Sequence, residues 1–312
     1  MSPRLDGLHH VTMITANVRE NVRFYAELLG LRLVKKTVNF DEPSAYHLYF
    51  GDESGAPGSI LTWFEFPQAA RGRPGAGMIH RLELGVPSEE SMDFWEQRLH
   101  DAVLPVKRHE SIVEFDDPEG LSLALVVAEP TEQPLSARDP EIPAEHAITG
   151  VRGARAYAHD TAQADHAALL TETLGFDWEE GEYLLDGTRR SFRWTYDPPP
   201  GEEGLQGAGT VHHIAWACED ADQPEWQQRV RDAGLRVTPV LDREYFTSIY
   251  FREPQGVLFE IATVGPGFAV DEDPAHLGEE LKLPPQHEHL RAQLEGTLTP
   301  VENPRARGGA PR

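Results

Sequence analysis

Two pairs of adjacent histidines and one carboxylate are the residues of this chain whose types suit a shared chemistry. The pairs are His9-His10 and His212-His213, each at the start of a β-rich stretch, and the carboxylate is Glu260 within an apolar stretch. Two imidazoles and one carboxylate form the ligand set of an Fe(II) or Mn(II) centre with positions left open for substrate and oxygen. His10 and His213 are 203 residues apart (213 minus 10), so only the fold can bring them together.

Strand alternation favours one histidine of each pair, because successive strand residues face opposite sides of a sheet. His10 and His213 share their faces with small or polar residues, which suit a cavity, whereas His9 and His212 share theirs with bulky apolar residues. Glu260 stands between two apolar neighbours, and a carboxylate in such a strand is costly unless it is paired or binds a metal. The sequence therefore predicts His10, His213 and Glu260 as metal ligands.

The other ten histidines stand outside these pairs. A single histidine on a strand or loop is more often structural or exposed than a metal ligand, so we assign no functional role to the following residues: His47, His80, His100, His109, His146, His159, His166, His276, His287 and His289.

The rest of the chain consists of one unit repeated four times, a strand followed by a helix and three further strands. The units span residues 8–66, 78–129, 149–198 and 208–265. Capping residues and glycines predict their helices from Asn17 to Gly30, Ser88 to His100, Asp160 to Gly175 and Asp222 to Gly234. Units two and four align at their Pro-x-Gly turns with an offset of 136 (254 minus 118).

Only the first and last units carry the candidate ligands. Unit two opens with His80-Arg81 and unit three with Arg152-Gly153, and unit two has Ala124 where unit four has Glu260. We therefore predict an α+β fold in which four βαβββ modules form two half-barrels. Modules one and four should pair around the metal, and modules two and three should pair with each other.

The chain order suggests two regions, 1–130 and 149–265, each holding two modules. Residues 131–148, rich in proline and acidic residues at their start, are expected to link them. Two interpretations stay open for the tail, residues 266–312: a frayed terminus, favoured for its last ten residues, or a lid formed by Phe268 to Leu290 over the cavity.

The composition narrows the partners. A net charge of −24 argues against binding to nucleic acid or to an anionic membrane. No apolar run approaches the roughly 18 residues of a membrane helix, and the first residues show no secretory signal, so a cytoplasmic location is expected. Cys218 is the only cysteine, which excludes intrachain disulfides and thiolate metal clusters. A homo-oligomer is compatible with the sequence.

Several motifs together resemble the vicinal-oxygen-chelate superfamily, which includes glyoxalase I, bleomycin-resistance proteins and extradiol dioxygenases. More narrowly, the chain resembles the hydroquinone-type ring-cleaving dioxygenases of bacteria. The similarity covers nearly the whole chain, and it is carried by the motifs at Leu8–Thr12, Tyr46–Phe50, Pro57–Ser59, Val211–His213, Ser248–Tyr250 and Gly256–Glu260.

The resemblance implies that a mononuclear Fe(II), with Mn(II) as the alternative, is held by His10, His213 and Glu260. It further implies that a small aromatic diol and O2 are the substrates. Besides the ligands, it assigns places at or near the active site to Tyr250, His9, His212, Thr12 and Arg243.

Two other functions on the same fold stay open. A glyoxalase-like lyase or isomerase usually employs a second carboxylate, and in unit one Glu65 is the candidate for it. A non-catalytic protein that sequesters a small molecule is the second alternative. The intact ligand set argues against it, because sequestration does not require one.

Overall fold

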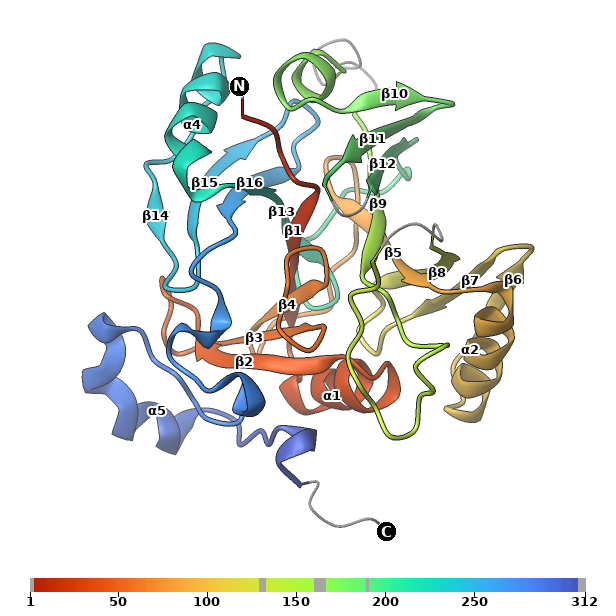
Figure 1. The fold of residues 1–312 in the computed structure, drawn as a ribbon, viewed down its shortest axis with the longest axis vertical. Coiled ribbons are helices and arrows are strands. Elements are labelled where there is room, and N and C mark those ends of the chain that lie inside the picture. The colour runs from red at the N-terminus through yellow and green to blue at the C-terminus, as the bar shows by residue number, and fades with distance from the viewer. Residues whose placement is uncertain (1–2, 129–132, 160–166, 189–190, 308–312) are drawn as a thin grey trace.

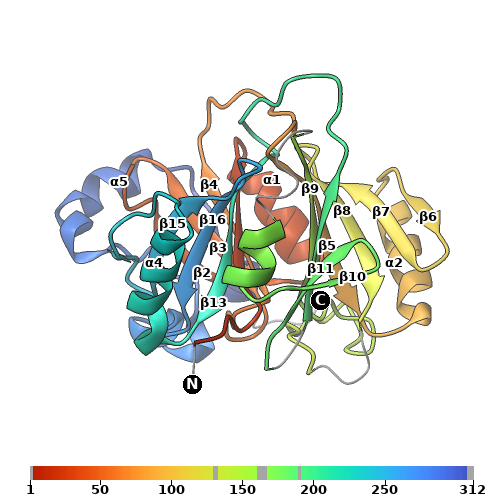
Figure 2. The ribbon, with the colours of Figure 1, turned by 90° about the horizontal axis from the view of Figure 1, so that it is seen from above.

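The computed structural model describes residues 3–128, 133–159, 167–188 and 191–307 (Figure 1). Two eight-stranded mixed sheets dominate it. Sheet I has the strand order β14-β15-β16-β13-β1-β4-β3-β2, and sheet II has the order β10-β11-β12-β9-β5-β8-β7-β6. Seen from above, the sheets stand side by side (Figure 2). Sheet I combines units one and four and sheet II combines units two and three, which confirms the predicted fold class and module pairing.

Sheet I is assembled from the two ends of the chain. Unit one contributes β1 (Leu8–Thr15), α1 (Val18–Val22), the π-helical turn η1 (Arg23–Leu28), β2 (Arg32–Val38), β3 (Tyr46–Gly51) and β4 (Ile60–Glu65). Unit four contributes β13 (Val211–Cys218), the short turn η3 (Asp220–Asp222), α4 (Gln223–Asp232), β14 (Leu241–Asp242), β15 (Thr247–Arg252) and β16 (Leu258–Thr263).

Sheet II comes from the middle of the chain. Unit two contributes β5 (Ile79–Val86), α2 (Glu89–Asp101), β6 (Lys107–His109), β7 (Ile112–Asp116) and β8 (Ser122–Val127). Unit three contributes β9 (Val151–Tyr157), the π-helical turn η2 (Leu169–Thr173), β10 (Asp177–Glu179), β11 (Glu182–Asp186) and β12 (Ser191–Asp197). Because each sheet draws on both halves of the chain, the domain boundaries at residues 130 and 149 stay a prediction.

The helix boundaries follow local capping chemistry. The Asn17 side chain accepts a hydrogen bond from the Glu20 amide at the start of α1, and Ser88 caps α2 in the same way. Gly30 has a φ of +72°, the left-handed conformation that ends a helix at low cost. Asp222 precedes α4 without a side-chain cap. The predicted helix start at Asp160 lies outside the described residues.

Aromatic packing and two buried carboxylates join the sheets. Trp194 of sheet II and Trp216 of sheet I pack edge to face with their ring centroids 6.1 Å apart. Tyr25 of unit one donates a hydrogen bond of 3.0 Å to Asp117 in the β7–β8 turn, and Tyr196 of unit three donates one of 3.0 Å to Glu253 in the β15–β16 turn. The two turns are the Pro-x-Gly turns that the repeat predicted, so the same contact is made twice between the sheets.

The tail covers the exposed edge of sheet I, where β2 would otherwise present unpaired backbone groups. The Lys282 amide donates to the Lys36 carbonyl at 2.9 Å, and the fully buried Lys35 forms ion pairs with Asp271, at 2.6 Å, and with Glu272. Helix α5 (Arg291–Thr297) lies beyond β2 on the same side (Figure 1). The tail thus closes a sheet edge at the side of the half-barrel.

Two further properties bear on the sequence expectations. Among the described residues, no helix combines the length and the apolar character needed to cross a membrane. Cys218, at the end of β13, is fully buried, and burial raises the pKa of its thiol to about 12.

Candidate metal centre

Each histidine pair lies at a β-bulge, where one strand has an extra residue. Along β1, Leu8 pairs with Trp216 and His10 pairs with the next residue of β13, Ala215, so His9 is the extra residue. At the other end of the same ladder, the extra residue belongs to β13 and is His212. A bulge breaks the regular alternation of strand faces and re-aims side chains. His9 and His212 therefore fall outside the regular alternation, whereas His10 and His213 keep it with Thr12 and Ala215 two residues on.

The structure brings His10, His213 and Glu260 together from three adjacent strands, all buried. The Nε2 atoms of the two histidines are 3.3 Å apart, and Glu260 Oε2 lies 3.3 Å from His10 Nε2 and 2.9 Å from His213 Nε2. Ligand bonds of roughly 2.1 Å that meet at right angles would put donor atoms about 3 Å apart. The observed triangle matches that spacing on all three sides.

The hydrogen bonds around His10 determine which of its nitrogens carries the proton. His9 Nε2 lies 3.1 Å from the Thr263 carbonyl, which can only accept, so this nitrogen is the donor. Burial lowers the pKa of His9 to about 3, so its ring is neutral and its Nδ1 accepts. His10 Nδ1, at 2.8 Å, must then donate to it. The unprotonated Nε2 of His10 is left facing the other two groups, as a metal ligand requires.

The other two groups are arranged in a similar way. His213 Nδ1 lies 2.7 Å from Nδ1 of His212, the counterpart of the contact between His9 and His10. Ser248 donates to Glu260 Oε1, whereas Oε2, although buried, accepts no hydrogen bond of good geometry from the described residues. The lone pair of His10 Nε2, the Nε2 atom of His213 and an unsatisfied carboxylate oxygen thus converge, a donor set that fits a divalent cation.

A cavity of about 400 Å³ opens beside this triangle, within the size range of small-molecule sites. One wall carries Tyr250, whose ring lies edge-on to that of His213 at 5.7 Å and whose hydroxyl accepts from Arg243 Nε at 3.3 Å. Arg243 also pairs with Asp41 at 3.1 Å. Burial, followed by the negative charge of Glu260, raises the pKa of Tyr250. Arg243 and Tyr250 therefore act as one unit on this wall.

The opposite wall contains two residues that the sequence reasoning missed. His47 and Tyr49 of β3 both line the cavity, and His47 Nδ1 lies 2.9 Å from the Tyr49 hydroxyl. His47 was set aside as a single strand histidine. Strand alternation could have predicted its position. Leu48 and Phe50 lie in the core, so His47 and Tyr49 lie on the other face of the strand.

Thr62, rather than Glu65, occupies the unit-one position that corresponds to Glu260. Thr62 pairs with Thr12 in the same register in which Glu260 pairs with Ala215. Thr12 and Ala215 each follow a candidate ligand by two residues. Glu65 does not line the cavity, and its carboxylate accepts from the Val18 amide at 3.3 Å at the start of α1. The candidacy of Glu65 for a second carboxylate at the cavity is therefore wrong, and the position that corresponds to Glu260 holds a hydroxyl instead.

Sheet II repeats the bulges without the ligands. Its extra residues are His80 in β5 and Arg152 in β9, which correspond to His212 and His9. The three positions that correspond to His10, His213 and Glu260 hold Gly153, Arg81 and Ala124. The second half-barrel thus keeps the backbone irregularity but lacks this donor set.

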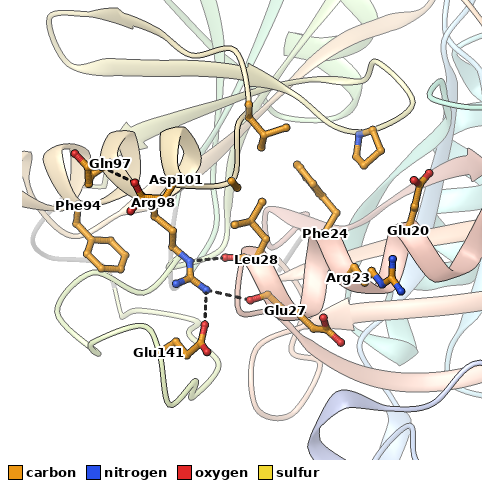
Figure 3. Close-up of a pocket in the computed structure, with 13 residues that line it drawn as sticks. Glu20, Arg23, Phe24, Glu27, Leu28, Phe94, Gln97, Arg98, Asp101 and Glu141 are labelled. Atoms are coloured by element: carbon orange, nitrogen blue, oxygen red, sulfur yellow. Dashed lines mark hydrogen bonds and ion pairs between the residues drawn. The ribbon is translucent and has the colours of Figure 1, made fainter.

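A larger cavity, of about 790 Å³, lies elsewhere, between η1 and α2 (Figure 3). Its most prominent polar group, Arg98, already donates to the carbonyls of Leu28 and Glu27 and to Glu141. Since this arginine is engaged by the protein itself, the larger volume does not mark it as the reaction site. The lining residues of the smaller cavity include none from the described part of the tail, so a lid stays a prediction.

Comparison with protein-family models shows to which superfamily the chain belongs. The model of the Glyoxalase/Bleomycin resistance protein/Dioxygenase superfamily matches residues 7–261. The chain belongs to this superfamily. The match covers all four units, and it confirms the resemblance that the motifs carried.

Curated members of the superfamily match over almost their whole length. The chain is 43% identical to "Putative ring-cleaving dioxygenase MhqO" of Bacillus subtilis (strain 168), covering 97% of this chain and 98% of that protein. It is 32% identical to "Chlorohydroquinone/hydroquinone 1,2-dioxygenase" of Sphingobium indicum, covering 95% and 96%. These relatives confirm the expectation that the chain is an enzyme, an oxidoreductase of the ring-cleaving dioxygenase class.

Solved structures agree on the fold. A crystal structure from Bacillus subtilis subsp. subtilis str. 168 superposes with a TM-score of 0.89 at 41% identity, covering 96% of this chain and 99% of that chain. Glyoxalase I from Zea mays superposes with a TM-score of 0.56 at 12% identity, covering 84% and 92%. The second similarity is one of fold alone.

Proposed function

We propose that this protein is an Fe(II)-dependent, extradiol-type dioxygenase that opens the ring of a dihydroxy-aromatic compound, a hydroquinone or a catechol, with O2. The observation that carries the proposal is the triangle of His10 Nε2, His213 Nε2 and Glu260 Oε2, with sides of 2.9–3.3 Å. Three ligands on one face of a metal leave the opposite face for substrate and oxygen. A relative named for hydroquinone cleavage supports the choice of substrate class.

In this proposal His10, His213 and Glu260 hold the metal, with Mn(II) as the alternative ion. When bound, the ion supplies Lewis acidity that lowers the pKa of a substrate hydroxyl, together with one-electron chemistry toward O2. His9 and His212 fix the rings of the two ligating histidines through the Nδ1 contacts. Their role is to keep both Nε2 lone pairs directed at the same point.

Tyr250 is proposed as the proton donor and acceptor for the reacting oxygens. Its hydroxyl oxygen accepts from Arg243, which leaves the tyrosine proton available to an oxygen in the cavity. In β15, Tyr250 pairs directly with Glu260 of β16, so it stands beside the ligands. Thr12, whose hydroxyl lies 3.2 Å from that of Thr62, is proposed to shape the polar floor under the substrate.

The decisive experiment is anaerobic loading with Fe(II), followed by oxygen-electrode assays on catechols and hydroquinones. We expect stoichiometric oxygen uptake with loss of the aromatic absorbance. Oxygen-independent turnover of a thiol adduct, without uptake in the presence of any diol, would instead favour the glyoxalase-like alternative. The replacement of its second carboxylate by Thr62 argues against that outcome. A cytoplasmic location and a homo-oligomer stay predictions.

A further inference from the structure

A chain of four buried polar side chains crosses the inner face of sheet I. Thr12 Oγ1 lies 3.2 Å from Thr62 Oγ1, which lies 2.6 Å from His47 Nε2, and His47 Nδ1 lies 2.9 Å from the Tyr49 hydroxyl. All four side chains are buried. Uncompensated burial of a polar group costs free energy, so a chain of this kind persists where its members satisfy one another.

The chain controls what the Tyr49 hydroxyl can do. Burial lowers the pKa of His47 well below its usual value, so its neutral ring has one donor and one acceptor nitrogen. When His47 Nδ1 donates to the Tyr49 oxygen, Nε2 accepts from Thr62, and Tyr49 directs its proton outward. When the chain runs the other way, Tyr49 donates to His47 and its oxygen can accept from another group. Tyr49 can therefore bind either a phenolate oxygen or a neutral hydroxyl in the cavity.

The position of Tyr49 distinguishes it from Tyr250. Tyr250 pairs directly with Glu260, whereas Tyr49 pairs with Thr62, Thr62 with Thr12, and Thr12 with His213. Tyr49 therefore lies on β3, two strands from β1 with His10 and three strands from β13 with His213, on the opposite wall. Strands in a sheet are about 4.8 Å apart, so its hydroxyl serves a substrate atom well away from the metal.

An aromatic side chain lies between the metal ligands and Tyr49. The ring of Phe64 lies 6.4 Å from that of His213 and 4.3 Å from that of His47, measured between centroids. A flat substrate ring can pack on Phe64 with one edge at the ligands and the other toward His47 and Tyr49. In a catechol both hydroxyls lie at the same edge of the ring. Only a para-diol carries its second hydroxyl at the far edge.

We propose that Tyr49, positioned by His47, binds the far hydroxyl of a para-dihydroxy ring and so makes hydroquinones, rather than catechols, the substrates of this site. The inference rests on the proposed function, since it takes the first hydroxyl to bind at the metal. Tyr49 contacts the substrate directly. His47 and Thr62 act through Tyr49 and are positioning residues.

The test compares two ligands and two tyrosines of β3. Hydroquinone and 4-methylphenol, which lacks the far hydroxyl, are titrated anaerobically into the Fe(II)-loaded protein. Tyr49→Phe should weaken hydroquinone binding about tenfold and leave the Kd of 4-methylphenol unchanged, as expected for loss of one hydrogen bond. Tyr46→Phe, on the core face of the same strand, is the matched control and should leave both Kd values unchanged.

A second pair of variants tests the positioning role. Thr62→Val removes the hydroxyl that holds His47, whereas Thr62→Ser keeps it. The preference for hydroquinone should fall with valine and be retained with serine, and the loss should appear in KM with kcat nearly unchanged. An unchanged preference in both Tyr49→Phe and Thr62→Val would overturn the inference. If Tyr49→Phe fails to fold, the valine and serine variants decide.

The binding measurements separate this inference from the proposed function. Wild-type protein that prefers hydroquinone but takes up no oxygen with any diol would refute the dioxygenase and retain the role of Tyr49. Wild-type protein that cleaves catechols and hydroquinones equally well, with no effect of Tyr49→Phe, would refute the role of Tyr49 and retain the dioxygenase.

Discussion

Replacing Glu260 with glutamine should have opposite effects on the metal-free and the metal-loaded protein. In the metal-free protein the carboxylate is fully buried, and its Oε2 accepts no well-aligned hydrogen bond from the described residues. Glu260→Gln keeps the size and removes a buried charge. We therefore expect the metal-free variant to unfold at the same or a higher temperature than the wild type.

In the metal-loaded protein the same change removes one of three ligands. At a metal concentration of 100 times Kd, binding stabilises the wild type by about 2.7 kcal/mol. The loss of a residue that only hydrogen-bonds a ligand weakens metal binding by roughly 10–100-fold, so we take about 100-fold as the minimum for losing a ligand itself. The stabilisation of the variant then falls to about 0.4 kcal/mol. At roughly 2 °C per kcal/mol, metal should raise Tm by about 5 °C in the wild type and about 1 °C in the variant.

The assay is anaerobic thermal unfolding with and without Fe(II), together with iron analysis after desalting. Glu65→Gln is the matched control, because Glu65 is also a buried glutamate of sheet I but serves the start of α1. The control should keep the full shift of Tm on metal addition. A Glu260→Gln protein that retained stoichiometric iron and the wild-type shift would refute the assignment of the ligands.

Three further outcomes are expected. Tyr250→Phe should lower kcat roughly 10²-fold with unchanged iron content, as measured by oxygen uptake, and an unchanged kcat would remove it from proton transfer. Burial raises the pKa of Asp117 to about 6 and of Glu253 to about 7, so the native state holds more protons than the unfolded state. The contribution of these two groups to the free energy of unfolding should therefore fall as pH rises from about 4 to 7. Urea unfolding of the double variant Asp117→Asn, Glu253→Gln should show a weaker fall than the wild type. Identical pH profiles of the two proteins would contradict the argument. Lys35→Met should cost about 3 kcal/mol and expose the tail to proteolysis, because Asp271 and Glu272 lose their buried partner, whereas Lys282→Met, in an exposed pair, should do neither.

The pairing of the outer units was predictable because it followed from a selective loss. In the four-fold repeat only the first and last copies keep histidine pairs. Two imidazoles and Glu260 can therefore meet only if units one and four lie side by side. The helix ends at Asn17 and Gly30 were predictable for a different reason, since capping depends on a few adjacent residues.

The parts that escaped prediction depend on register. The bulges at His9 and His212 cannot be read from alternation, because a bulge is an exception to alternation. Glu65 was considered as a second carboxylate because it is the only candidate near the unit-one position that matches Glu260, and only the observed pairing of Thr62 with Thr12 shows which residue corresponds to Glu260. His47 was set aside because a lone histidine carries little information until its neighbours in space are known.

The burial of Cys218 has a consequence for the surroundings in which such an enzyme would work. Hydroquinones oxidise in air to quinones, which are electrophiles that arylate thiolates. The only cysteine of the chain is enclosed at the end of β13, and a pKa raised to about 12 leaves almost none of it as thiolate at neutral pH. The folded protein therefore offers these electrophiles no reactive sulfur. Arylation at sulfur, the reaction by which quinones inactivate thiol-dependent enzymes, is therefore not open to the folded protein at neutral pH.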